Sequence, residues 1–340
     1  MTVAVLVLAA GQGTRMQSGK QKILHEVGGK PMVWHVFATA AAVATIPPVL
    51  VVGPGEDGVR ELIGDRAVYV VQPEQLGTGH ATMVAAPVLQ GRADQVIVTY
   101  GDMPLLKPGT LARLAQRRVE TSAAVVMLSV MGDSDSSFGR VVRDENGRVC
   151  EIVEVAEARQ RASSSELLAI RELNVGVYCF DASWLWQHIH SLPLRQARSG
   201  REYYLTDMVE LAVNQGRLVE AIVTDDADEC LGAGTRAELV TVEKAFRRRT
   251  NAHWLASGVT LVDPDTIYID PNVTIGQDTV LWPNTYLQGN SVIGADCILG
   301  PNTIIRNARI GNGCRIEQAV VENAAIADGV TVEPFSHISE

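Results

Sequence analysis

Residues 269–305 read IDPNVTIGQDTVLWPNTYLQGNSVIGADCILGPNTII, and an aliphatic side chain returns at every sixth position of this stretch. Glycine, asparagine, aspartate and proline crowd the positions between, as a repeatedly turning chain requires. This strict period is the signature of a hexapeptide-repeat parallel β-helix, in which stacked coils share one aliphatic core. The aliphatic positions are Ile269, Ile275, Leu281, Leu287, Ile293, Leu299 and Ile305.

Beyond Ile305 the register of the repeat shifts twice. It moves by one residue at Ile310, continues at Ile316, shifts again and resumes from Ile326. These shifts either mark bulged or looped corners or mean that the repeat is lost. If it continues, about four coils fit between residues 258 and 340. No capping segment follows, although repeat proteins normally need one, so either a partner chain covers the end or the natural chain is longer.

The segment before the repeats, residues 235–257, reads TRAELVTVEKAFRRRTNAHWLAS. Its apolar residues recur at helical spacing and Gly258 follows, so we predict one amphipathic helix that ends at this glycine. We interpret the basic run Arg247–Arg249 as a solvated face of that helix. The chain then divides into a domain of residues 1–234, this connecting helix, and a partial β-helix of residues 258–340.

From residue 3 to about residue 223, short apolar runs alternate with helical patterns, beginning with VAVLVL at residues 3–8. Near-continuous apolar strands separated by helices predict a parallel sheet with helices on both faces. Such sheets bind ligands at the carboxyl ends of their strands, and residues 9–15 and 100–102 follow two of these strands. Residues 138–154 instead predict a hairpin around Asn146-Gly147, which could form a second wall of a pocket.

Composition excludes several classes of protein. The 340 residues include 39 acidic and 29 basic side chains, and this net charge of −10 argues against a nucleic-acid-binding surface. Five scattered cysteines without CxxC spacing predict reduced core residues, with neither a disulfide framework nor a zinc site. The first strand lacks a basic region before it and is too short to span a bilayer, so we expect no signal peptide, no membrane association and a cytoplasmic location.

The loop LAAGQGTRMQSGKQK at residues 8–22 fails two phosphate-loop patterns. Met16 stands where the dinucleotide fingerprint has its third glycine, and Gln21 stands where the Walker A loop has its magnesium-binding hydroxyl. What remains is a tight turn after a strand, with two glycines and three cations, Arg15, Lys20 and Lys22, that suit phosphate binding. The alternative is a flexible surface loop.

The same loop resembles the signature of sugar-1-phosphate nucleotidyltransferases. Further segments resemble, over essentially the whole chain, the family of bifunctional N-acetylglucosamine-1-phosphate uridyltransferase/glucosamine-1-phosphate acetyltransferases. These segments are VVQPEQLGTGHA (70–81), YGDMPLL (100–106), FGRVV (138–142), EIVE (151–154), LNVGVY (173–178) and EYYLTD (202–207). The resemblance implies a Rossmann-like nucleotidyltransferase domain with a mostly parallel sheet, followed by a short left-handed parallel β-helix. It also implies transfer of a uridylyl group from UTP to N-acetylglucosamine 1-phosphate, which gives UDP-N-acetylglucosamine, a cell-wall precursor, and pyrophosphate.

Site residues follow from the resemblance, position by position. Arg15 and Lys22 would bind the triphosphate and stabilise the transition state, and Lys22 is the principal catalytic candidate. The nucleotide would contact Leu8, Ala10, Gly11, Gly13, Gln72, Gly77 and Thr78. The sugar would contact Tyr100, Gly101, Gly139, Glu154 and Asn174. The glutamine suits uracil on chemical grounds as well, because its amide offers a donor and an acceptor to an imide edge.

Asp102 is the candidate ligand of Mg²⁺, since it ends a strand and supplies the hard oxygen that this ion prefers. The alternative is a turn-forming aspartate. The resemblance places a second metal ligand, an asparagine, where this chain has Gly234, so Asp225, Asp226 or Asp228, or water, would have to take its place.

Other departures concern the substrate. VAEA at residues 155–158 replaces a lysine and an aspartate common in the family, and Val175 replaces a hydroxyl residue, so the sugar is less certain than uridylyl transfer. The alternatives are a nucleotidyltransferase for another sugar 1-phosphate or NTP, and a non-catalytic nucleotide-sugar-binding subunit. The chain ends where the acetyltransferase coils of the family begin, so we expect no acetyltransferase activity, His337 in an exposed coil, and a homotrimer formed through the β-helix.

Overall fold

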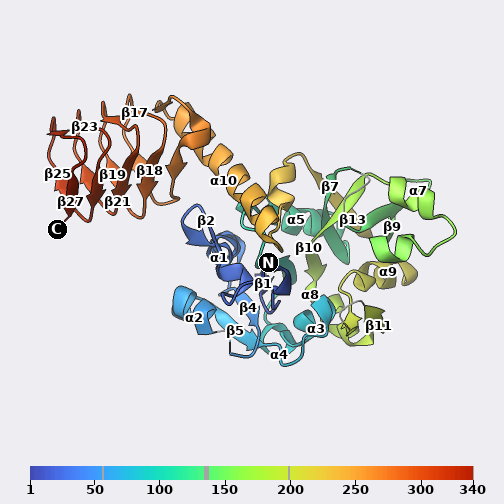
Figure 1. The fold of residues 1–340 in the computed structure, drawn as a ribbon. Coiled ribbons are helices and arrows are strands. Elements are labelled where there is room, and N and C mark those ends of the chain that lie inside the picture. The colour runs from blue at the N-terminus through green and yellow to red at the C-terminus, as the bar shows by residue number, and fades with distance from the viewer. Residues whose placement is uncertain (56, 134–137, 198–199, 340) are drawn as a thin grey trace. The chain divides into compact units, whose positions relative to one another are not determined.

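The strand β1 (Val3–Leu8) is buried on both faces and lies inside a nine-stranded sheet (Figure 1). The computed structural model describes residues 1–55, 57–133, 138–197 and 200–339, which form two compact units. The sheet belongs to the first unit and runs in the order β13-β7-β10-β6-β1-β4-β5. Its other strands are β4 (Val49–Val52), β5 (Val68–Val71), β6 (Gln95–Tyr100), β7 (Val125–Met131), β10 (Glu172–Asp181), β13 (Val219–Thr224), β8 (Arg140–Arg143) and β9 (Val149–Val153).

The sheet is mostly parallel, as predicted. β1 pairs in parallel with β4 and β6, β4 with β5, and β7 with β13. Among the seven strands of this order, only β10 is antiparallel to its neighbours, β6 and β7. The predicted hairpin is also present, because β8 and β9 pair antiparallel around a turn in which Gly147 adopts a φ of 77°.

Alternate residues of β1 face two separate cores, which explains its unbroken apolar sequence. Val5 and Val7 pack with the helices of one face, whereas Leu6 packs with those of the other. One face is covered by α1 (Met32–Val43), α2 (Asp57–Ile63) and α5 (Pro108–Thr121). The other is covered by α3 (Gly77–Met83), α4 (Ala86–Leu89), α8 (Ala182–His188) and α9 (Asp207–Asn214).

The repeats form the predicted left-handed parallel β-helix, with short strands stacked in three sheets. One sheet stacks β14 (Thr260–Leu261), β17 (Val280–Leu281), β20 (Ile298–Leu299), β23 (Arg315–Ile316) and β26 (Thr331–Val332). The second stacks β15 (Tyr268–Ile269), β18 (Thr285–Gln288), β21 (Thr303–Arg306), β24 (Val320–Glu322) and β27 (His337–Ser339). The third stacks β16 (Thr274–Ile275), β19 (Val292–Ile293), β22 (Arg309–Ile310) and β25 (Ala325–Ile326).

The two register shifts are shortened corners, and the repeat is not lost. β22 still pairs with β19 and β25, and β24 with β21 and β27, so stacking continues through both shifts. The shifts comprise three five-residue steps, one from Ile305 to Ile310 and two from Ile316 through Val321 to Ile326. Each contains one residue with a positive φ: Asn307, Gln318 and Asn323. Six-residue steps also contain such a residue, for example Asp278, Asn284 and Asp296, so both kinds of step turn through a left-handed bend.

The predicted connecting helix is α10 (Arg236–Ala256), and Gly258 follows it with a φ of 86°. The second unit comprises the chain from Leu239 onward together with residues 26–31, a hairpin of β2 (Glu26–Val27) and β3 (Lys30–Pro31). The hairpin is anchored by Gly28, whose amide donates to Glu243 Oε2 at 2.8 Å. No sequence pattern indicated this grouping, because a six-residue turn carries no long-range signal.

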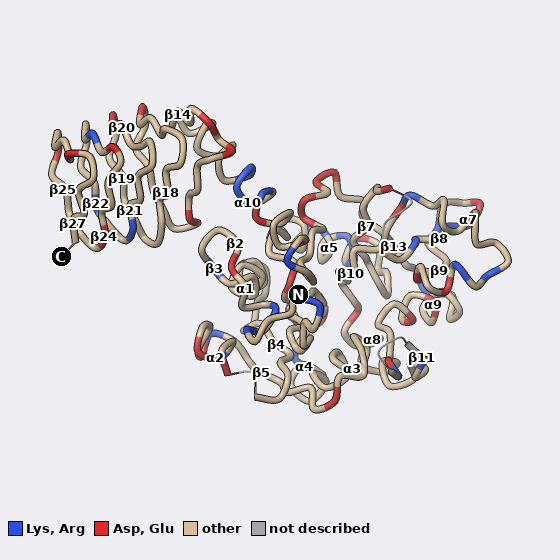
Figure 2. The backbone as a smooth tube through the Cα atoms, viewed as in Figure 1, with Lys and Arg blue, Asp and Glu red and all other residues tan. Residues whose placement is uncertain are grey.

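The charged residues, the helices and the cysteines of the structure can be compared with the composition. Basic and acidic residues alternate along the backbone of both units (Figure 2). Among the residues that the structure describes, no helix is both long enough and apolar enough to cross a membrane. The five cysteines are free thiols, four of them buried.

Candidate active site

The loop after β1 is shaped by two left-handed residues. Gly13 has a φ of 64° and Gln17 a φ of 48°, and the 3-10 helix η1 (Thr14–Met16) lies between them. A Cβ atom on Gly13 would lie 2.4 Å from Cβ of Lys22, so only glycine lets the chain double back this closely. The loop therefore packs Lys22, near its end, against Gly13, near its start.

This loop forms one wall of a cavity of about 480 Å³ at the carboxyl ends of β1 and β6. The segment that follows β5 and the helix α3 also line it. The residues predicted to contact the nucleotide all line this cavity: Leu8, Ala10, Gly11, Gly13, Gln72, Gly77 and Thr78. We refer to it as the loop cavity.

Gln72 is held at the end of β5 with only 4% of its surface exposed. Its Nε2 donates to the Gly77 carbonyl at 3.2 Å and lies 3.2 Å from His80 Nδ1. Gln75, which the sequence analysis did not single out, donates through Nε2 to the Ala10 carbonyl at 2.6 Å. This contact ties the loop to the segment before α3, and the motif PEQ at residues 73–75 was its available signal.

A second cavity, of about 780 Å³, contains the predicted sugar residues Tyr100, Gly139, Glu154 and Asn174. We refer to it as the hairpin cavity, since β8 and β9 flank Gly139 and Glu154. Gly101 lines neither of these cavities, because its amide donates to the Leu8 carbonyl within the sheet edge. The two cavities share Lys22, Thr78, Tyr100, Asp102 and Glu202.

Three further polar residues of the segment EYYLTD line the cavities without having been assigned a role from sequence. They are Glu202, Tyr204 and Thr206. The segment was one of those that carried the family resemblance, so the signal was present but residue roles were not drawn from it.

Asn174 is fixed in the hairpin cavity by Tyr178. Its Nδ2 donates to the tyrosine hydroxyl at 2.8 Å, and its Oδ1 accepts from the Gly176 amide at 3.0 Å. Burial, with the nearby charge of Glu154 and Asp102, raises the pKa of Tyr100, so this hydroxyl stays protonated. A Cβ on Gly176 would lie 2.4 Å from the Tyr100 ring, so the glycine makes room for it.

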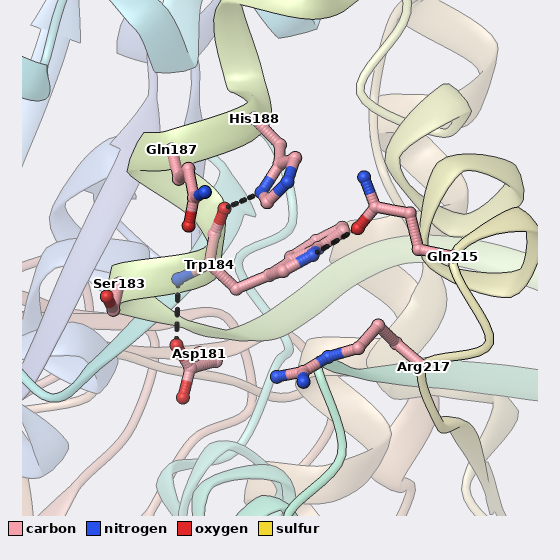
Figure 3. A pocket seen from close by; sticks show the side chains of 7 residues that line it. All are labelled: Asp181, Ser183, Trp184, Gln187, His188, Gln215 and Arg217. Carbon is pink, nitrogen blue, oxygen red and sulfur yellow. Dashed lines mark hydrogen bonds between the residues drawn. The ribbon is translucent and has the colours of Figure 1, made fainter.

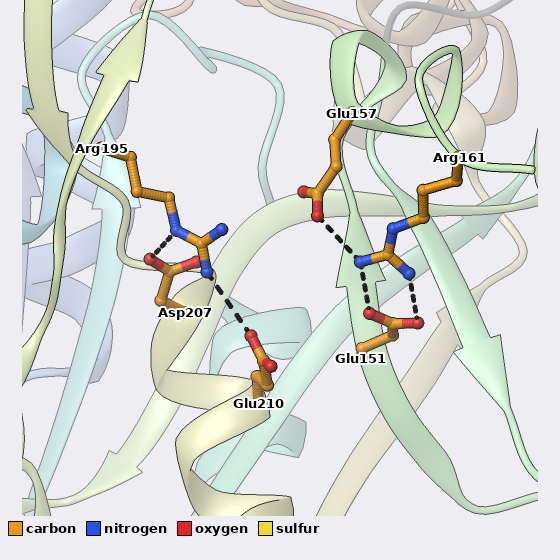
Figure 4. Close-up of polar contacts among 6 residues, drawn as sticks. All are labelled: Glu151, Glu157, Arg161, Arg195, Asp207 and Glu210. Carbon is orange, nitrogen blue, oxygen red and sulfur yellow. Dashed lines mark hydrogen bonds and ion pairs between the residues drawn. The ribbon is translucent and has the colours of Figure 1, made fainter.

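Glu154 carries a raised pKa, first because it is buried and then because Glu157 and Asp207 place negative charge near it. Arginines hold both of these neighbours (Figure 4). Arg161 pairs with Glu157 at 2.8 Å, and Arg195 pairs with Asp207 at 2.8 Å. The arginines thus bind two carboxylates that do not line the hairpin cavity, whereas Glu154 lines it together with Asp102, Glu202 and Glu238.

Lys22 and Asp102 meet where the two cavities join. Lys22 Nζ lies 2.5 Å from Asp102 Oδ2, and both side chains remain partly exposed. A cation suited to phosphate and a carboxylate suited to a hard metal ion therefore stand at one point of the site. Arg15 lines the hairpin cavity only.

The donor set for a second metal ligand is sparse. Asp226 is bound to Lys107 at 2.6 Å and accepts from the Asp228 amide, and neither cavity is lined by Asp225, Asp226 or Asp228. No group of three or more histidine, cysteine, aspartate or glutamate side chains that could hold a metal occurs in the described parts of the chain. Asp102 alone fits a magnesium ion that takes most of its oxygen ligands from phosphate and water.

A third cavity, of about 270 Å³, lies at α8 and is distant in sequence from the loop (Figure 3). The residues that line it form hydrogen bonds with one another. Trp184 Nε1 donates to Gln215 Oε1 at 2.9 Å, and Asp181 caps α8 by accepting from the Trp184 amide. It follows β10 at the strand end that points away from the carboxyl end of β6, and it contains none of the predicted site residues.

Comparison with known proteins is consistent with this division. The family model for the MobA-like NTP transferase domain matches residues 5–196, and that for the bacterial transferase hexapeptide, with six repeats, matches residues 272–307. The chain is 41% identical to the bifunctional protein GlmU of Exiguobacterium sibiricum over 335 residues, covering 98% of this chain and 73% of that protein. It is 42% identical to bifunctional protein GlmU of Pelotomaculum thermopropionicum, covering 99% and 72%. With the GlmU protein of Pelobacter propionicus the identity is 41%, covering 99% and 72%.

Proposed function

Because the chain belongs to the GlmU family, we propose that it transfers a uridylyl group from UTP to N-acetylglucosamine 1-phosphate and releases pyrophosphate. One observation supports this most strongly. Lys22 and Asp102 stand in contact where the loop cavity and the hairpin cavity join. A phosphoryl transfer between two substrates needs its charge-stabilising groups at the point where those substrates meet.

The reaction needs no general base. A sugar phosphate is already largely ionised near neutral pH, since the second pKa of a phosphate monoester is about 6. Its oxygen attacks the α-phosphorus in line, and pyrophosphate leaves from the opposite side. Lys22 and Arg15 neutralise the charge that spreads over the phosphoryl oxygens, and the loop amides around Gly11 and Gly13 hold the triphosphate.

In the loop cavity, Gln72, Gly77 and Thr78 would read uracil, and all three line this cavity. In the hairpin cavity Glu154 and Asn174 bind sugar hydroxyls, and Tyr100 and Gly139 complete the wall. Asp102 would hold Mg²⁺, which supplies additional positive charge to the phosphates when bound.

We extend the proposal to the whole protein in three respects. It acts in the cytoplasm, it associates as a homotrimer through the β-helix, and its partners are UTP and the sugar 1-phosphate. The absence of acetyltransferase activity from this chain also stays a prediction.

The substrates can be identified by pyrophosphate release from pairs of compounds. UTP, ATP, CTP and GTP are each combined with the 1-phosphates of N-acetylglucosamine, glucose and mannose. We expect the highest kcat/KM with UTP and N-acetylglucosamine 1-phosphate. A different preferred pair would point to another nucleotidyltransferase of the same superfamily.

A non-catalytic subunit that binds nucleotide sugars is the second candidate, and Gly234 is the observation that favours it, since it offers no side-chain ligand. The variant Lys22→Ala distinguishes the two, with Lys20→Ala as control because Lys20 lines neither cavity. Pyrophosphate release that Lys22→Ala abolishes and Lys20→Ala preserves excludes the binding subunit. No release with any pair would leave only that candidate.

A further inference from the structure

We propose that Gly234 is a positioning residue: it lets the Arg15 guanidinium take the space of a second side-chain metal ligand, so that this chain binds its divalent ion tightly only together with the nucleotide. The inference rests on the proposed function for the identity of the nucleotide. The part that concerns metal binding without nucleotide depends only on how Arg15, Asp102 and Gly234 are arranged.

The space beside Gly234 is already filled. A Cβ atom built on this buried residue would lie 2.5 Å from Nη2 of Arg15 and 3.2 Å from its Cζ. Carbon and nitrogen atoms do not approach this closely without bonding, so any side chain at position 234 would displace the guanidinium. The φ of Gly234 is not in the left-handed region, so the backbone does not by itself require glycine here. What the glycine provides is room for Arg15.

The segment that contains Gly234 lies against the candidate metal ligand. The Ala233 amide donates to the Asp102 carbonyl at 3.2 Å, and Asp102 and Gly234 line the same cavity. A side chain at position 234 would thus begin in the cavity that Asp102 also lines, with Arg15 and Glu238 as its nearest neighbours. In this chain a cation stands in that place.

The nearest carboxylate does not replace the missing ligand. Glu238 Oε2 lies 3.2 Å from the Cβ position of residue 234, but it accepts the Gly234 amide at 2.7 Å. This oxygen is therefore used at the N-terminus of α10. The alternative arrangement is a metal site formed by the second oxygen of Glu238 and by Asp102 before the nucleotide binds.

Two cations oppose binding of the ion in the absence of nucleotide, against the carboxylates of Glu154, Glu202 and Glu238 that line the same cavity. Lys22 Nζ lies 2.5 Å from Asp102 Oδ2, and Arg15 adds a second positive charge to the same cavity. A divalent cation would have to replace Lys22 on Asp102 and remain close to Arg15. A triphosphate changes both conditions, because it neutralises the two side chains and brings the oxygen ligands that magnesium usually takes from its substrates. Metal and nucleotide should therefore bind cooperatively.

The first experiment measures Mn²⁺ binding to the whole chain without nucleotide, by the electron paramagnetic resonance of the free ion. It compares the wild type, Gly234→Asn and Gly234→Ala. Both substitutions displace Arg15, but only asparagine offers an oxygen donor. We expect weak binding by the wild type and binding about tenfold or more tighter by Gly234→Asn, with Gly234→Ala not reaching that affinity.

The second experiment measures UTP binding by equilibrium dialysis, with EDTA and then with saturating Mn²⁺. No sugar phosphate is present, so no turnover occurs. We expect Mn²⁺ to tighten UTP binding to the wild type by about tenfold or more. This arm needs no substitution. Binding of UTP to the wild type that Mn²⁺ does not tighten would overturn the inference even if the Gly234 variants do not fold.

The inference is overturned if the wild type binds Mn²⁺ without nucleotide as tightly as Gly234→Asn does. Loss of that affinity in Glu238→Gln would then identify Glu238 as the ligand of a preformed site. Failure of the proposed function is a separate result: UTP would not bind, or no pyrophosphate would form. The comparison of Mn²⁺ affinities without nucleotide would still be informative in that case.

Discussion

Lys22 reaches Asp102 because Gly13 has no side chain. The loop turns through a left-handed glycine, and a methyl group on Gly13 would lie only 2.4 Å from the Cβ of Lys22. The cation is thus positioned by packing within its own loop. Residue-scale contacts of this kind determine how well the site stabilises a transferring phosphoryl group.

Gly13→Ala should lower kcat/KM for UTP by about 100-fold, because a shift of about 1 Å in a catalytic group costs that much. Steady-state pyrophosphate release is the measurement. Gly19→Ala is the matched control in the same loop, since a Cβ there meets nothing within 4 Å and the φ is not left-handed. Equal loss in both variants would show that loop flexibility, and not the position of Lys22, accounts for the effect.

Glu154 should make the folded chain less stable as it ionises. Its pKa is raised, so folding favours the protonated form, and the stability relative to a neutral side chain falls as pH rises through that raised pKa. Glu154→Gln should therefore unfold at a higher temperature than the wild type at pH 8, with the difference vanishing in acid. Thermal unfolding at several pH values measures this.

The same variant should bind the sugar phosphate more weakly. A hydrogen bond to a charged group contributes about 1.5 to 3 kcal/mol, so KM should rise about tenfold or more. A Glu154→Gln chain that is less stable at pH 8 and keeps its KM would contradict the role assigned to this carboxylate.

At the scale of elements, the sequence predicts what depends on local pattern. The period of six predicts the β-helix, and Asn146-Gly147 predicts the hairpin of β8 and β9. The hairpin at residues 26–31 escaped prediction because Gly28 and Gly29 are fixed by Phe246 and Asp270, far along the chain. Gln75 escaped for a similar reason, since its hydrogen bond to Ala10 spans 65 residues.

Helix α10 is fixed to the first coil of the β-helix by Asn251. Its Nδ2 donates to the Pro264 carbonyl at 2.7 Å and to the Ile267 carbonyl at 3.2 Å. Asn251→Ala should lower the free energy of unfolding by about 1 to 3 kcal/mol, because buried acceptors lose their donor. Chemical denaturation is the measurement. Lys244→Ala, at an exposed position of the same helix, should change it by less than about 0.5 kcal/mol.

At the scale of the whole molecule, exposed apolar side chains of the β-helix predict association. Trp282 is 43% exposed and Phe335 86%, although a coil surface in water favours polar residues. Sedimentation equilibrium at micromolar concentration should give three times the 36.6 kDa mass of one chain. A single species of 36.6 kDa would contradict the homotrimer and leave these side chains to another partner.

The family and its architecture could be predicted from the sequence because motifs and periods are local. The contact between Lys22 and Asp102, where the two cavities join, could not be predicted, because these residues are 80 positions apart in the sequence. Nor could the close approach of the Arg15 guanidinium to Gly234, because the sequence records a missing side chain but not what fills its space.

The central claim is that this site cleaves UTP between its α- and β-phosphates and joins the uridylyl group to a sugar phosphate. UTP labelled at the α-phosphorus, incubated with N-acetylglucosamine 1-phosphate and Mg²⁺, tests it most directly. All converted label should appear in UDP-N-acetylglucosamine, with unlabelled pyrophosphate in equal amount. Label that stays in UTP, or appears in UMP or UDP without the sugar, would contradict the account.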